Sequence, residues 1–387
     1  MKSDPSIYVV SAKRTPFGRF LGSLADLSPV DLAAAAGEVA LKGIDRRTID
    51  LCVFGNVLSA GHGMNISRQI ALKLGLEMET PAFTANQMCA SGMTSVLLGI
   101  QAIRAGEATT VLCGGTESMS RAPRLVNDSR AGQKFGDMRL MDSLLQDGLT
   151  DPSSGKHMGL TAEALATRYH ISREAQDAFA VRSHQKWDAA EKRGAFAHER
   201  IPLDALATDE QARPETSLDK LAKLRPAFQK DGTVTAANAS GVNDGAAAIV
   251  IADAGTCERE GWTPLARVTG WATTGCDPQW MGLGPVYAIR KLCARFGASL
   301  ADFDAMEINE AFAAQVLACA RELEIDDARL NTHGGAIAIG HPIGTSGARL
   351  TAHLAHRIAN GEIRSGLASL CVGGGMGIAL ALGSVKE

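Results

Sequence analysis

The organisation of this chain is clearest around Asn86-Gln87-Met88-Cys89-Ala90-Ser91-Gly92, where a cysteine stands between a predicted strand and a predicted helix. Two later stretches are built alike, Gly340-His341-Pro342-Ile343-Gly344 and Cys371-Val372-Gly373-Gly374-Gly375-Met376-Gly377. Each sets a cysteine or a histidine among small residues, where the backbone can turn tightly and approach a ligand. Two thiols and one imidazole are the groups that acyl transfer through a covalent thioester requires.

Outward from this turn, the sequence contains an internal repeat. In each half a polar residue ends a strand, a Ser-Gly pair opens a helix, and a cysteine followed by glycines ends the next strand. The positions are Asn56, Ser91-Gly92 and Cys113-Gly114-Gly115 in the first half, and Asn309, Ser346-Gly347 and Cys371-Val372-Gly373-Gly374 in the second. Reuse of small residues at turns is the alternative explanation. Duplication, which we favour, predicts two α/β units packed with pseudo-twofold symmetry around a shared centre.

β-Branched runs alternate with helical patterns, which is typical of α/β layers around a largely buried sheet. One helix is predicted after Cys89 and ends at Gly106, and another is predicted after His341 and ends at Asn360-Gly361. The predicted strands span residues 7–10, 51–54, 110–113, 248–252, 305–308 and 377–381.

Residues 119–245 fall outside the repeat. This segment is richer in charge, proline and glycine, and it contains its own helix from the N-cap Ser172 to Lys192-Arg193-Gly194. A long insertion with its own structure is more often a lobe that covers a substrate than a linker. The expected domains are an N-terminal half (1–118 and 246–262), the inserted lobe (119–245) and a C-terminal half (263–387).

Composition narrows the function classes. A chain of 387 residues is too long for one compact core, and its 45% hydrophobic and 21% charged residues are ordinary for a globular protein. A net charge of −3 without a basic run argues against nucleic-acid binding. The apolar runs are far shorter than the roughly 20 residues that a membrane span needs. Since Met1-Lys2-Ser3-Asp4-Pro5 lacks the features of a targeting peptide, we expect a cytoplasmic protein.

The cysteines and histidines predict no metal site. No two of the 8 cysteines lie close enough for a zinc knuckle or a CxxC motif, and reduced thiols are expected. His353 and His356 have the spacing of two ligands on one helical turn, but no acidic or cysteine partner is nearby. We therefore predict a solvated helix face for this pair. The cysteines expected to be buried and structural are Cys52, Cys113, Cys293 and Cys319.

Cys89 is the candidate nucleophile. It precedes a helix whose free N–H groups and positive dipole end favour thiolate over thiol. The alternative is a buried structural cysteine. A place at a strand-to-helix turn, between Met88 and Ala90-Ser91-Gly92, favours the accessible and reactive role.

His341 is the candidate base, because it lies between Gly340 and Pro342 on a tight loop rather than on an apolar face. A lone histidine is more often a satisfied core or surface group, and we assign that role to the others. These are His170, His184 and His198.

Cys371 and Asn309 complete the candidate site. Cys371 precedes three glycines whose amides can form a nest for negative charge, and its thiol could exchange the α-proton of an acyl thioester. A phosphate loop is the competing interpretation, but no Lys or Ser/Thr follows as a P-loop requires. Asn309 follows a strand and precedes a helix, where an Asn-Glu pair is most often a capping group.

Together with Asn309-Glu310-Ala311-Phe312, the three stretches resemble the thiolase family, the acetyl-CoA acetyltransferases and 3-ketoacyl-CoA thiolases. The resemblance extends from Ser11-Ala12-Lys13-Arg14-Thr15-Pro16 to the last strand. It implies an α/β thiolase fold of two duplicated halves in five layers, αβαβα. It also implies that the insertion is a loop domain that carries most of the coenzyme A contacts.

The resemblance implies a role for each candidate. Cys89 is the nucleophile that becomes acylated, and His341 takes its proton and helps to hold the thioester oxyanion. Cys371 is the acid and base of the carbon–carbon bond chemistry. The N–H groups of Gly373 and Cys89 form one oxyanion hole, and Asn309 holds a water that binds the other carbonyl oxygen together with His341.

The substrate contacts are also implied by resemblance. Glu310 orients the site without direct catalysis, and His157-Met158-Gly159 looks like the family's acyl-pocket segment. No metal or redox cofactor is implied, since coenzyme A thioesters are the substrates. The other expected contacts are Phe228 and Ser240 with pantetheine, Arg213 with adenine, and Met281, Ala311 and Phe312 along the acyl and pantetheine channel.

Four positions depart from the usual family pattern. Ala90 stands where Gly is usual, His333 where Asn is usual, Ala237 where Gly is usual, and Lys220 where a short polar residue is common. None of them is a catalytic candidate. His333, Ala237 and Lys220 bear on the shape and charge of the coenzyme A cleft, whereas Ala90 slightly restricts the Cys89 turn but leaves the cysteine's own N–H available.

The implied reaction is a Claisen condensation and its reverse, two acetyl-CoA to and from acetoacetyl-CoA and CoA. His157-Met158-Gly159, Asp147-Gly148-Leu149 and Met281-Gly282 resemble the short-chain type more than the medium- or long-chain type of β-oxidation, which is the alternative. Thiolases are dimers or tetramers, so a homotetramer or homodimer is expected. The region from Glu117-Ser118-Met119-Ser120 onward would form any tetramerisation arm.

Three other classes stay open at this point. A decarboxylating ketoacyl synthase shares the fold and the nucleophile but uses a second histidine or an asparagine where this chain has Cys371. A cysteine hydrolase needs only Cys89, His341 and Asn309 and would not depend on coenzyme A. A non-catalytic lipid-binding or redox protein would join Cys89 to Cys371 in a reversible disulfide, but retention of all four chemical positions argues against it.

Overall fold

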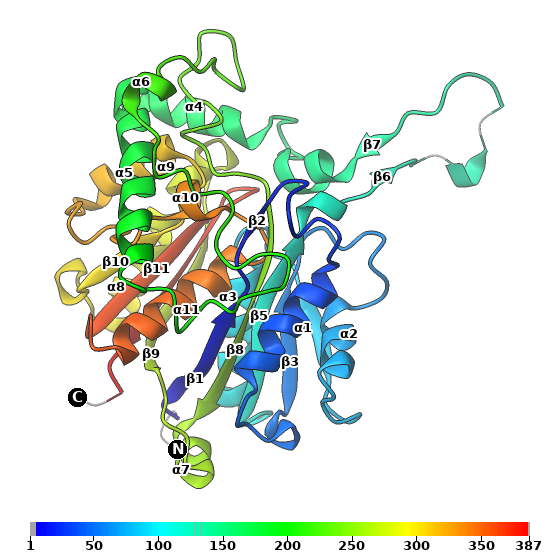
Figure 1. Ribbon diagram of the computed structural model, residues 1–387, viewed down its shortest axis with the longest axis vertical. Coiled ribbons are helices and arrows are strands. Elements are labelled where there is room, and N and C mark those ends of the chain that lie inside the picture. The colour runs from blue at the N-terminus through cyan, green and yellow to red at the C-terminus, as the bar shows by residue number, and fades with distance from the viewer. Residues whose placement is uncertain (1–4, 128, 133, 386–387) are drawn as a thin grey trace.

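The computed structural model describes residues 5–127, 129–132 and 134–385 (Figure 1). Residues 1–4, where no targeting signal is expected, lie outside the described residues. The main sheet has the strand order β10-β11-β12-β9-β1-β8-β5-β3-β4, and β2 (Gly18–Arg19) pairs with β8 at one side. The other strands of this sheet are β1 (Ile7–Arg14), β3 (Leu51–Gly55), β4 (Ala82–Ala85), β5 (Thr110–Ser118), β8 (Asn243–Asp253), β9 (Ala266–Gly275), β10 (Ala305–Ile308), β11 (Ser365–Val372) and β12 (Met376–Gly383).

The two ends of this sheet have the same topology. In the first half β3 runs parallel to β5, β5 antiparallel to β8, and β8 antiparallel to β1. In the second half β10 runs parallel to β11, β11 antiparallel to β12, and β12 antiparallel to β9. Outside β3 lies the parallel strand β4, and Met306 of β10 makes a parallel bridge to Leu330 at the equivalent place. The predicted duplication is therefore confirmed by the order and direction of the strands.

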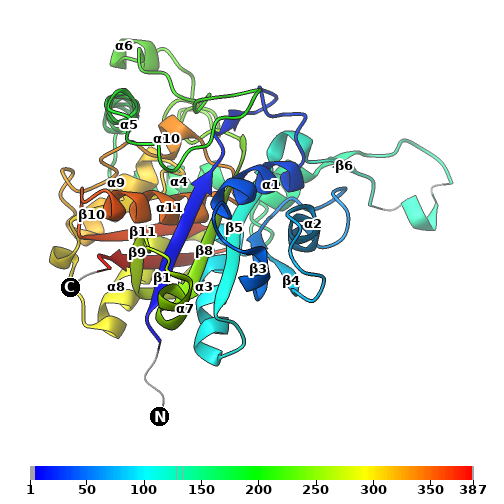
Figure 2. The same ribbon diagram turned by 60° about the horizontal axis from the view of Figure 1, so that its bottom comes forward.

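Helices cover the outer faces of both half-sheets and fill the space between them (Figures 1 and 2). Helices α3 and α11 pack against each other in the middle, each also against its own half-sheet, so the five predicted layers are present. The outer helices are α1 (Pro29–Ala40) and α2 (Ile66–Lys73) on the first half and α8 (Gly284–Phe296) and α9 (Ala313–Leu323) on the second; the middle helices are α3 (Ser91–Ala105) and α11 (Ser346–Ala359).

The middle helices end where the sequence predicts. Helix α3 stops at Gly106, which adopts a left-handed φ of +76° that a glycine allows at low cost. Helix α11 stops at Asn360, before Gly361. The apolar positions of α3 pack into the central core with Leu350 and Leu354 of α11.

Strand β5 differs from its prediction. It continues to Ser118, so Gly114 and Gly115 lie inside the strand and do not end it. A Cβ on Gly115 would stand 2.2 Å from the carbonyl oxygen of Gly344, and one on Gly114 would stand 2.1 Å from that of Ala247. These glycines therefore serve close packing of the strand against its neighbours rather than a turn. Strand β9 was not predicted. The strands expected before Cys89 and at Cys371, for which no bounds were predicted, are β4 and β11.

The insertion forms a lobe over one end of the sheet and an extended arm (Figure 1). Helix α5 (Arg173–Lys192) starts as predicted at Ser172, whose hydroxyl accepts the Ala175 N–H. The strands β6 (Arg124–Leu125) and β7 (Met141–Asp142) pair antiparallel in the arm. The remaining helices are α4 (Met158–Arg168), α6 (Leu218–Leu221), α7 (Ala254–Glu260) and α10 (Ala336–Ile339), with short turns η1 (Arg46–Thr48), η2 (Met119–Arg121), η3 (Ser129–Ala131), η4 (Leu144–Leu149), η5 (Pro278–Leu283) and η6 (Leu300–Asp302).

Among the described residues, no helix combines the length and the apolar character that crossing a membrane demands.

Candidate active site

Cys89 stands at the tip of the turn between β4 and α3. Met88 adopts a positive φ of 48°, a strained conformation for a residue other than glycine. The hydroxyl of Ser91 holds the turn, because it accepts the Gln87 N–H at 2.9 Å and donates to the Met88 carbonyl at 2.6 Å. The turn thus places the thiol one residue before the N-cap of α3, as predicted.

Burial dominates the electrostatics of Cys89. Burial raises the pKa of its thiol to about 11, while hydrogen bonds from the Gly373 N–H and from its own N–H act in the opposite direction. The helix N-terminus was expected to favour the thiolate, but burial outweighs the backbone N–H groups in the resting protein, so the thiol form is favoured. The same two N–H groups, aimed at one point, have the arrangement of an oxyanion hole.

Two hydrogen bonds position His341. Its backbone N–H donates to Asn243 Oδ1 at 2.9 Å, and its Nδ1 lies 2.5 Å from Ser346 Oγ, at the start of α11. Because the Ser346 hydroxyl donates to the Pro342 carbonyl, it accepts from Nδ1, which leaves Nε2 as a proton acceptor. Burial and the charge of Arg349 lower the pKa of His341 to about 3, so the ring is neutral at rest.

Asn309 contacts this imidazole. Its Nδ2 lies 3.3 Å from His341 Nε2, and its backbone N–H donates to the Ser369 carbonyl at 2.9 Å. The N-cap position of α9 is Phe312 rather than Asn309, so the capping interpretation is wrong.

Cys371 lies near the end of β11, before a turn in which Gly374 and Gly375 have φ of 84° and 82°. A residue with a side chain would be strained there, so these glycines are required by the backbone. Burial, followed by the nearby Cys89 thiol, raises the pKa of Cys371 well above that of an ordinary thiol. The group is therefore a proton donor at neutral pH.

One apolar cavity of about 270 Å³ joins these groups. Cys89, His341, Cys371 and Gly373 line it, and Asn309 lies behind His341. Leu144, Leu149, Met119 and Ile343 form part of its wall, and of these the sequence did not assign Leu144 and Met119 to the site.

Most of the predicted substrate contacts line the same cavity. His157 caps α4 by accepting the Gly159 N–H at 3.0 Å, and its ring stacks on Phe228 at 4.8 Å. A Cβ on Gly159 would stand 2.3 Å from the Phe228 ring, so the glycine allows this stack. The other predicted contacts on the cavity wall are Met158, Ser240, Met281, Ala311 and Phe312.

Arg213 lies elsewhere. It lines a second cavity, also about 270 Å³, together with His184 and Lys220. Its N–H donates to His184 Nδ1 at 3.2 Å. The charged residues that line this polar cavity are Arg213, Lys220 and Glu215.

Two buried glutamates support the site: Glu310, which the resemblance implied as an orienting residue, and Glu117, whose role was found only in the structure. Glu310 accepts from Ser183 Oγ, Asn331 Nδ2 and the Ile337 N–H, which fixes the segment before His341. Glu117 accepts three backbone N–H groups, among them that of Gly344, and burial raises its pKa to about 7. A lone glutamate inside an apolar strand was the available signal for Glu117.

The prediction for His353 and His356 is wrong. Both side chains are buried, at 2% and 5% exposure, and neither lies on a solvated face. His353 Nδ1 is 2.7 Å from Glu199 Oε2, and His356 Nε2 donates to the Ala12 carbonyl at 2.7 Å. Within the described part of the chain, no group of three or more potential ligands could hold a metal ion.

Family models match both halves of the chain. The model described as "Thiolase, N-terminal domain" matches residues 7–255, and "Thiolase, C-terminal domain" matches residues 262–384. An acetyl-CoA acetyltransferase of Cupriavidus necator is 46% identical over 97% of this chain and 98% of its own. The mitochondrial 3-ketoacyl-CoA thiolase of Homo sapiens is also 46% identical, over 98% of both chains.

Solved structures agree with the fold. The human mitochondrial 3-ketoacyl-CoA thiolase in complex with CoA superposes with a TM-score of 0.97, at 46% identity over 99% of this chain and 98% of that one. The acetyl-CoA acetyltransferase of Bacillus anthracis also reaches a TM-score of 0.97, at 37% identity over the whole of both chains.

Proposed function

Because the chain belongs to the thiolase family and is an acyltransferase of coenzyme A thioesters, we propose that it interconverts two acetyl-CoA with acetoacetyl-CoA and CoA. The observation that carries this proposal is the single apolar cavity lined by Cys89, His341, Cys371 and Gly373. It holds a nucleophile, a base and a second thiol within reach of one ligand. The second thiol distinguishes this set from the ketoacyl synthase and hydrolase alternatives.

In the first half-reaction Cys89 attacks the keto carbon of the 3-ketoacyl-CoA while its proton passes to His341 Nε2. The N–H groups of Cys89 and Gly373 stabilise the oxyanion that forms. A neutral Cys–His pair at rest avoids two buried charges, so the ion pair forms only as the substrate arrives. Cleavage of the carbon–carbon bond leaves an acyl-cysteine and the enolate of acetyl-CoA.

In the second half-reaction Cys371 donates its proton to the enolate carbon, which releases acetyl-CoA. Its raised pKa supports this role, since the thiol is protonated before the reaction. Free CoA then gives its thiol proton to the Cys371 thiolate and attacks the acyl-cysteine, and the Cys89 sulfur that leaves takes back the proton held by His341. Condensation follows the same path in reverse, with the Cys371 thiolate taking a methyl proton.

Cavity size supports a short acyl chain. The volume of about 270 Å³ lies below the roughly 300–1,000 Å³ that is typical of sites for drug-sized ligands. The same cavity also holds the Phe228 and Ser240 side, which we assign to the end of pantetheine. Little of the space is then left for an acyl group longer than four or five carbons.

A medium- or long-chain 3-ketoacyl-CoA is the second candidate. A neighbouring cavity of about 370 Å³ shares Gly148, Met158 and Gly373 with the first. A longer chain could extend into this space if the shared wall yields.

A homotetramer is supported by the arm, on which Met138 and Leu140 are exposed. A cytoplasmic location stays a prediction.

Steady-state thiolysis with free CoA, across 3-ketoacyl-CoA esters of graded length, tests the proposal. Activity confined to the four- and five-carbon esters is the expected result. Equal or rising activity on longer esters would instead support the second candidate. Absence of CoA-dependent cleavage at every length would overturn the proposed reaction.

A further inference from the structure

The segment that carries His341 is closely packed along its length. Within this segment, a Cβ on Gly334 would stand 2.6 Å from the Ser183 carbonyl oxygen, and one on Gly335 would stand 2.3 Å from Glu310 Cδ. Helix α10 follows, and then Gly340 and His341. A shift at the start of this segment therefore has no free space to absorb it and is passed along the backbone toward His341.

Helix α11 contacts this segment at both ends. Ser346, the first residue of α11, bonds His341 Nδ1 at 2.5 Å. Glu362, three residues beyond the last helical residue, bonds His333 Nε2 at 2.7 Å through Oε1. Helix α11 and the turn that follows it thus contact both ends of this segment, at His341 and at His333.

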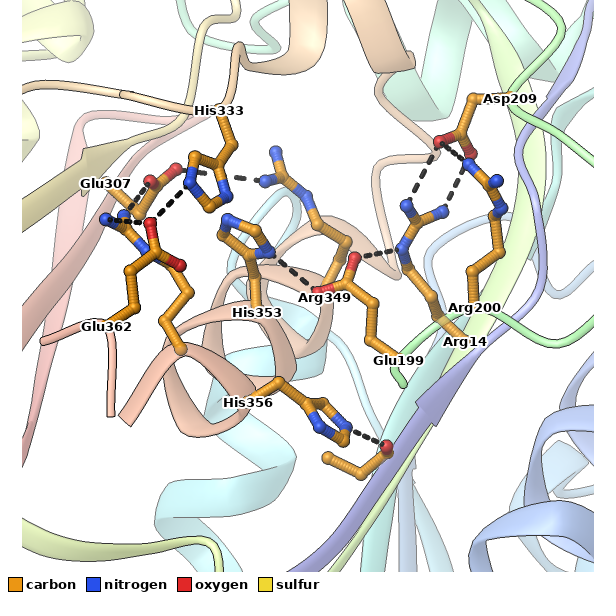
Figure 3. Close-up of polar contacts among 12 residues, drawn as sticks. Arg14, Glu199, Arg200, Asp209, Glu307, His333, Arg349, His353, His356 and Glu362 are labelled. Carbon is orange, nitrogen blue, oxygen red and sulfur yellow. Dashed lines mark hydrogen bonds and ion pairs between the residues drawn. The ribbon is translucent and has the colours of Figure 1, made fainter. Parts of the chain in front are cut away.

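A second histidine holds His333 from the side (Figure 3). The ring of His353, in the middle of α11, meets the ring of His333 edge to face at 5.0 Å. His353 is bonded to Glu199, which also accepts from Arg14 Nε at 2.7 Å. Arg14 is in turn paired with Asp209 of the lobe through two hydrogen bonds, at 2.7 and 3.0 Å.

The bond between His333 and Glu362 has a defined direction. A carboxylate only accepts, so Nε2 carries the proton and the imidazole donates it. The groups that face this ring are Glu362, Arg357 and His353, with the charge of Arg193 farther off. Burial and the charges of His353, Arg357 and Arg193 lower its pKa, whereas the Glu362 carboxylate raises it. Arg357 also donates to Glu362 Oε1, at 3.3 Å, which keeps that oxygen in place.

We propose that His333 is a positioning residue for the catalytic base, because its bond to Glu362 and its contact with His353 fix the His341 segment against α11. His333 stands where the family usually has Asn, whose shorter side chain ends closer to the backbone than the distal imidazole nitrogen. The arrangement therefore belongs to this chain's own combination of His333, His353 and Glu362. It rests on the thiolase reaction proposed above, since His341 is the base of that reaction.

The test compares His333→Ala and Glu362→Ala with the conservative variant Glu362→Gln in the full-length protein. The control is His356→Gln, which removes another buried histidine of α11, one bonded to strand β1 instead. Two readouts are needed: kcat and KM for thiolysis of acetoacetyl-CoA, and the pH profile of Cys89 alkylation by iodoacetamide, followed by peptide mass. The alkylation reports on the Cys89–His341 pair and does not need turnover.

The expected result is a kcat lowered by roughly ten- to a hundred-fold in His333→Ala and Glu362→Ala, because a misplacement of about 1 Å costs that much. KM should stay within about two-fold, and the alkylation midpoint should move upward as Cys89 loses its proton acceptor. Glu362→Gln keeps an acceptor oxygen and should restore most of kcat. His356→Gln should leave both readouts unchanged.

The proposal is overturned if His333→Ala keeps parental kcat and an unmoved midpoint, or if His356→Gln lowers kcat as strongly. If His333→Ala does not fold, the difference between Glu362→Ala and Glu362→Gln decides in the same way. Should the parent fail to cleave acetoacetyl-CoA, the proposed function falls. The alkylation profiles would still show whether His333 positions His341.

Discussion

Helices α3 and α11 occupy equivalent places in the two halves and lie against each other in the middle layer, yet they are built from opposite kinds of residue. Helix α3 presents Met93, Val96 and Ile100 to the core. Helix α11 is buried more completely than α3 but carries Arg349, His353, His356 and Arg357, none more than 5% exposed. One topology thus accepts either apolar packing or a buried polar network.

The difference matches what each helix delivers to the site. Helix α3 follows Cys89, whose placement is set by its own turn, so non-directional packing behind it suffices. Helix α11 contacts the base His341, whose Nε2 must stay unprotonated while Nδ1 carries a proton. The hydrogen bond with Ser346 supplies that control, and Glu307 pairs with Arg357 at 3.4 Å and lies 4.0 Å from Arg349, which holds the helix to β10.

Removing the nucleophile should have the largest effect. Cys89→Ala should lower kcat by about 10⁴-fold or more, because no acyl-enzyme can form. Cys371→Ala should lose thiolysis to a similar extent but still accept one acetyl group from acetyl-CoA on Cys89. Intact-protein mass after incubation with acetyl-CoA separates the two, and acetylation of Cys89→Ala at another residue would contradict the assignment.

Breaking the polar network of α11 should have the next largest effect. Glu307→Ala leaves Arg349 and Arg357 buried without the carboxylate that both approach, which should cost about 3–5 kcal/mol of the free energy of unfolding. In α3, Ile100→Val should cost only about 1 kcal/mol. Urea unfolding at one protein concentration compares them. Equal losses would show that α11, like α3, is held by packing alone.

Much of the fold could be predicted from the sequence, because apolar periodicity and the glycines that end helices are local signals. Both middle helices, the duplication and helix α5 are examples. Strand β9 was missed because it mixes small and polar residues, and its burial depends on partners far along the chain. Strand β5 was cut short because Gly114 was taken for a strand end.

The chemical groups were found from sequence, since their motifs are local, but their surroundings were not. The buried carboxylates Glu117 and Glu310 and the network of α11 depend on contacts between segments more than a hundred residues apart or between two helix faces. His353 and His356 illustrate this. Their spacing fits a solvated face, and only Glu199 and the Ala12 carbonyl, both distant in sequence, explain why they are buried.

Acid should destabilise the buried polar network around α11 more than the apolar packing of α3. Burial and the charges of His353, Arg357 and Arg193 lower the pKa of His333 to about 3, against about 6.5 for a free histidine, while Glu362 acts in the opposite direction. Between these values the unfolded chain holds a proton that the folded one lacks. The free energy of unfolding therefore falls as the pH falls from about 6.5 toward 3, by up to about 1.4 kcal/mol per pH unit for this group.

His333→Asn removes that group and should flatten the dependence of unfolding free energy on pH between about pH 6 and 4. The measurement is a series of urea unfolding curves at fixed ionic strength. Ile100→Val, on the apolar helix, should keep the parental slope. A slope unchanged in His333→Asn would mean that His333 is protonated in the folded protein.

The smallest effect is expected where the two helices begin. The N-cap residues Ala90 and Thr345 both have right-handed helical φ and ψ, and neither makes a side-chain cap. Ala90 has a φ of −83°, which any residue adopts, so the turn does not require a glycine at this position. Ala90→Gly should therefore change kcat by no more than about two-fold and the free energy of unfolding by no more than about 1 kcal/mol. A marked gain in kcat would instead show that Ala90 restrains the Cys89 turn, so that the two helix starts differ in stiffness as well as in chemistry.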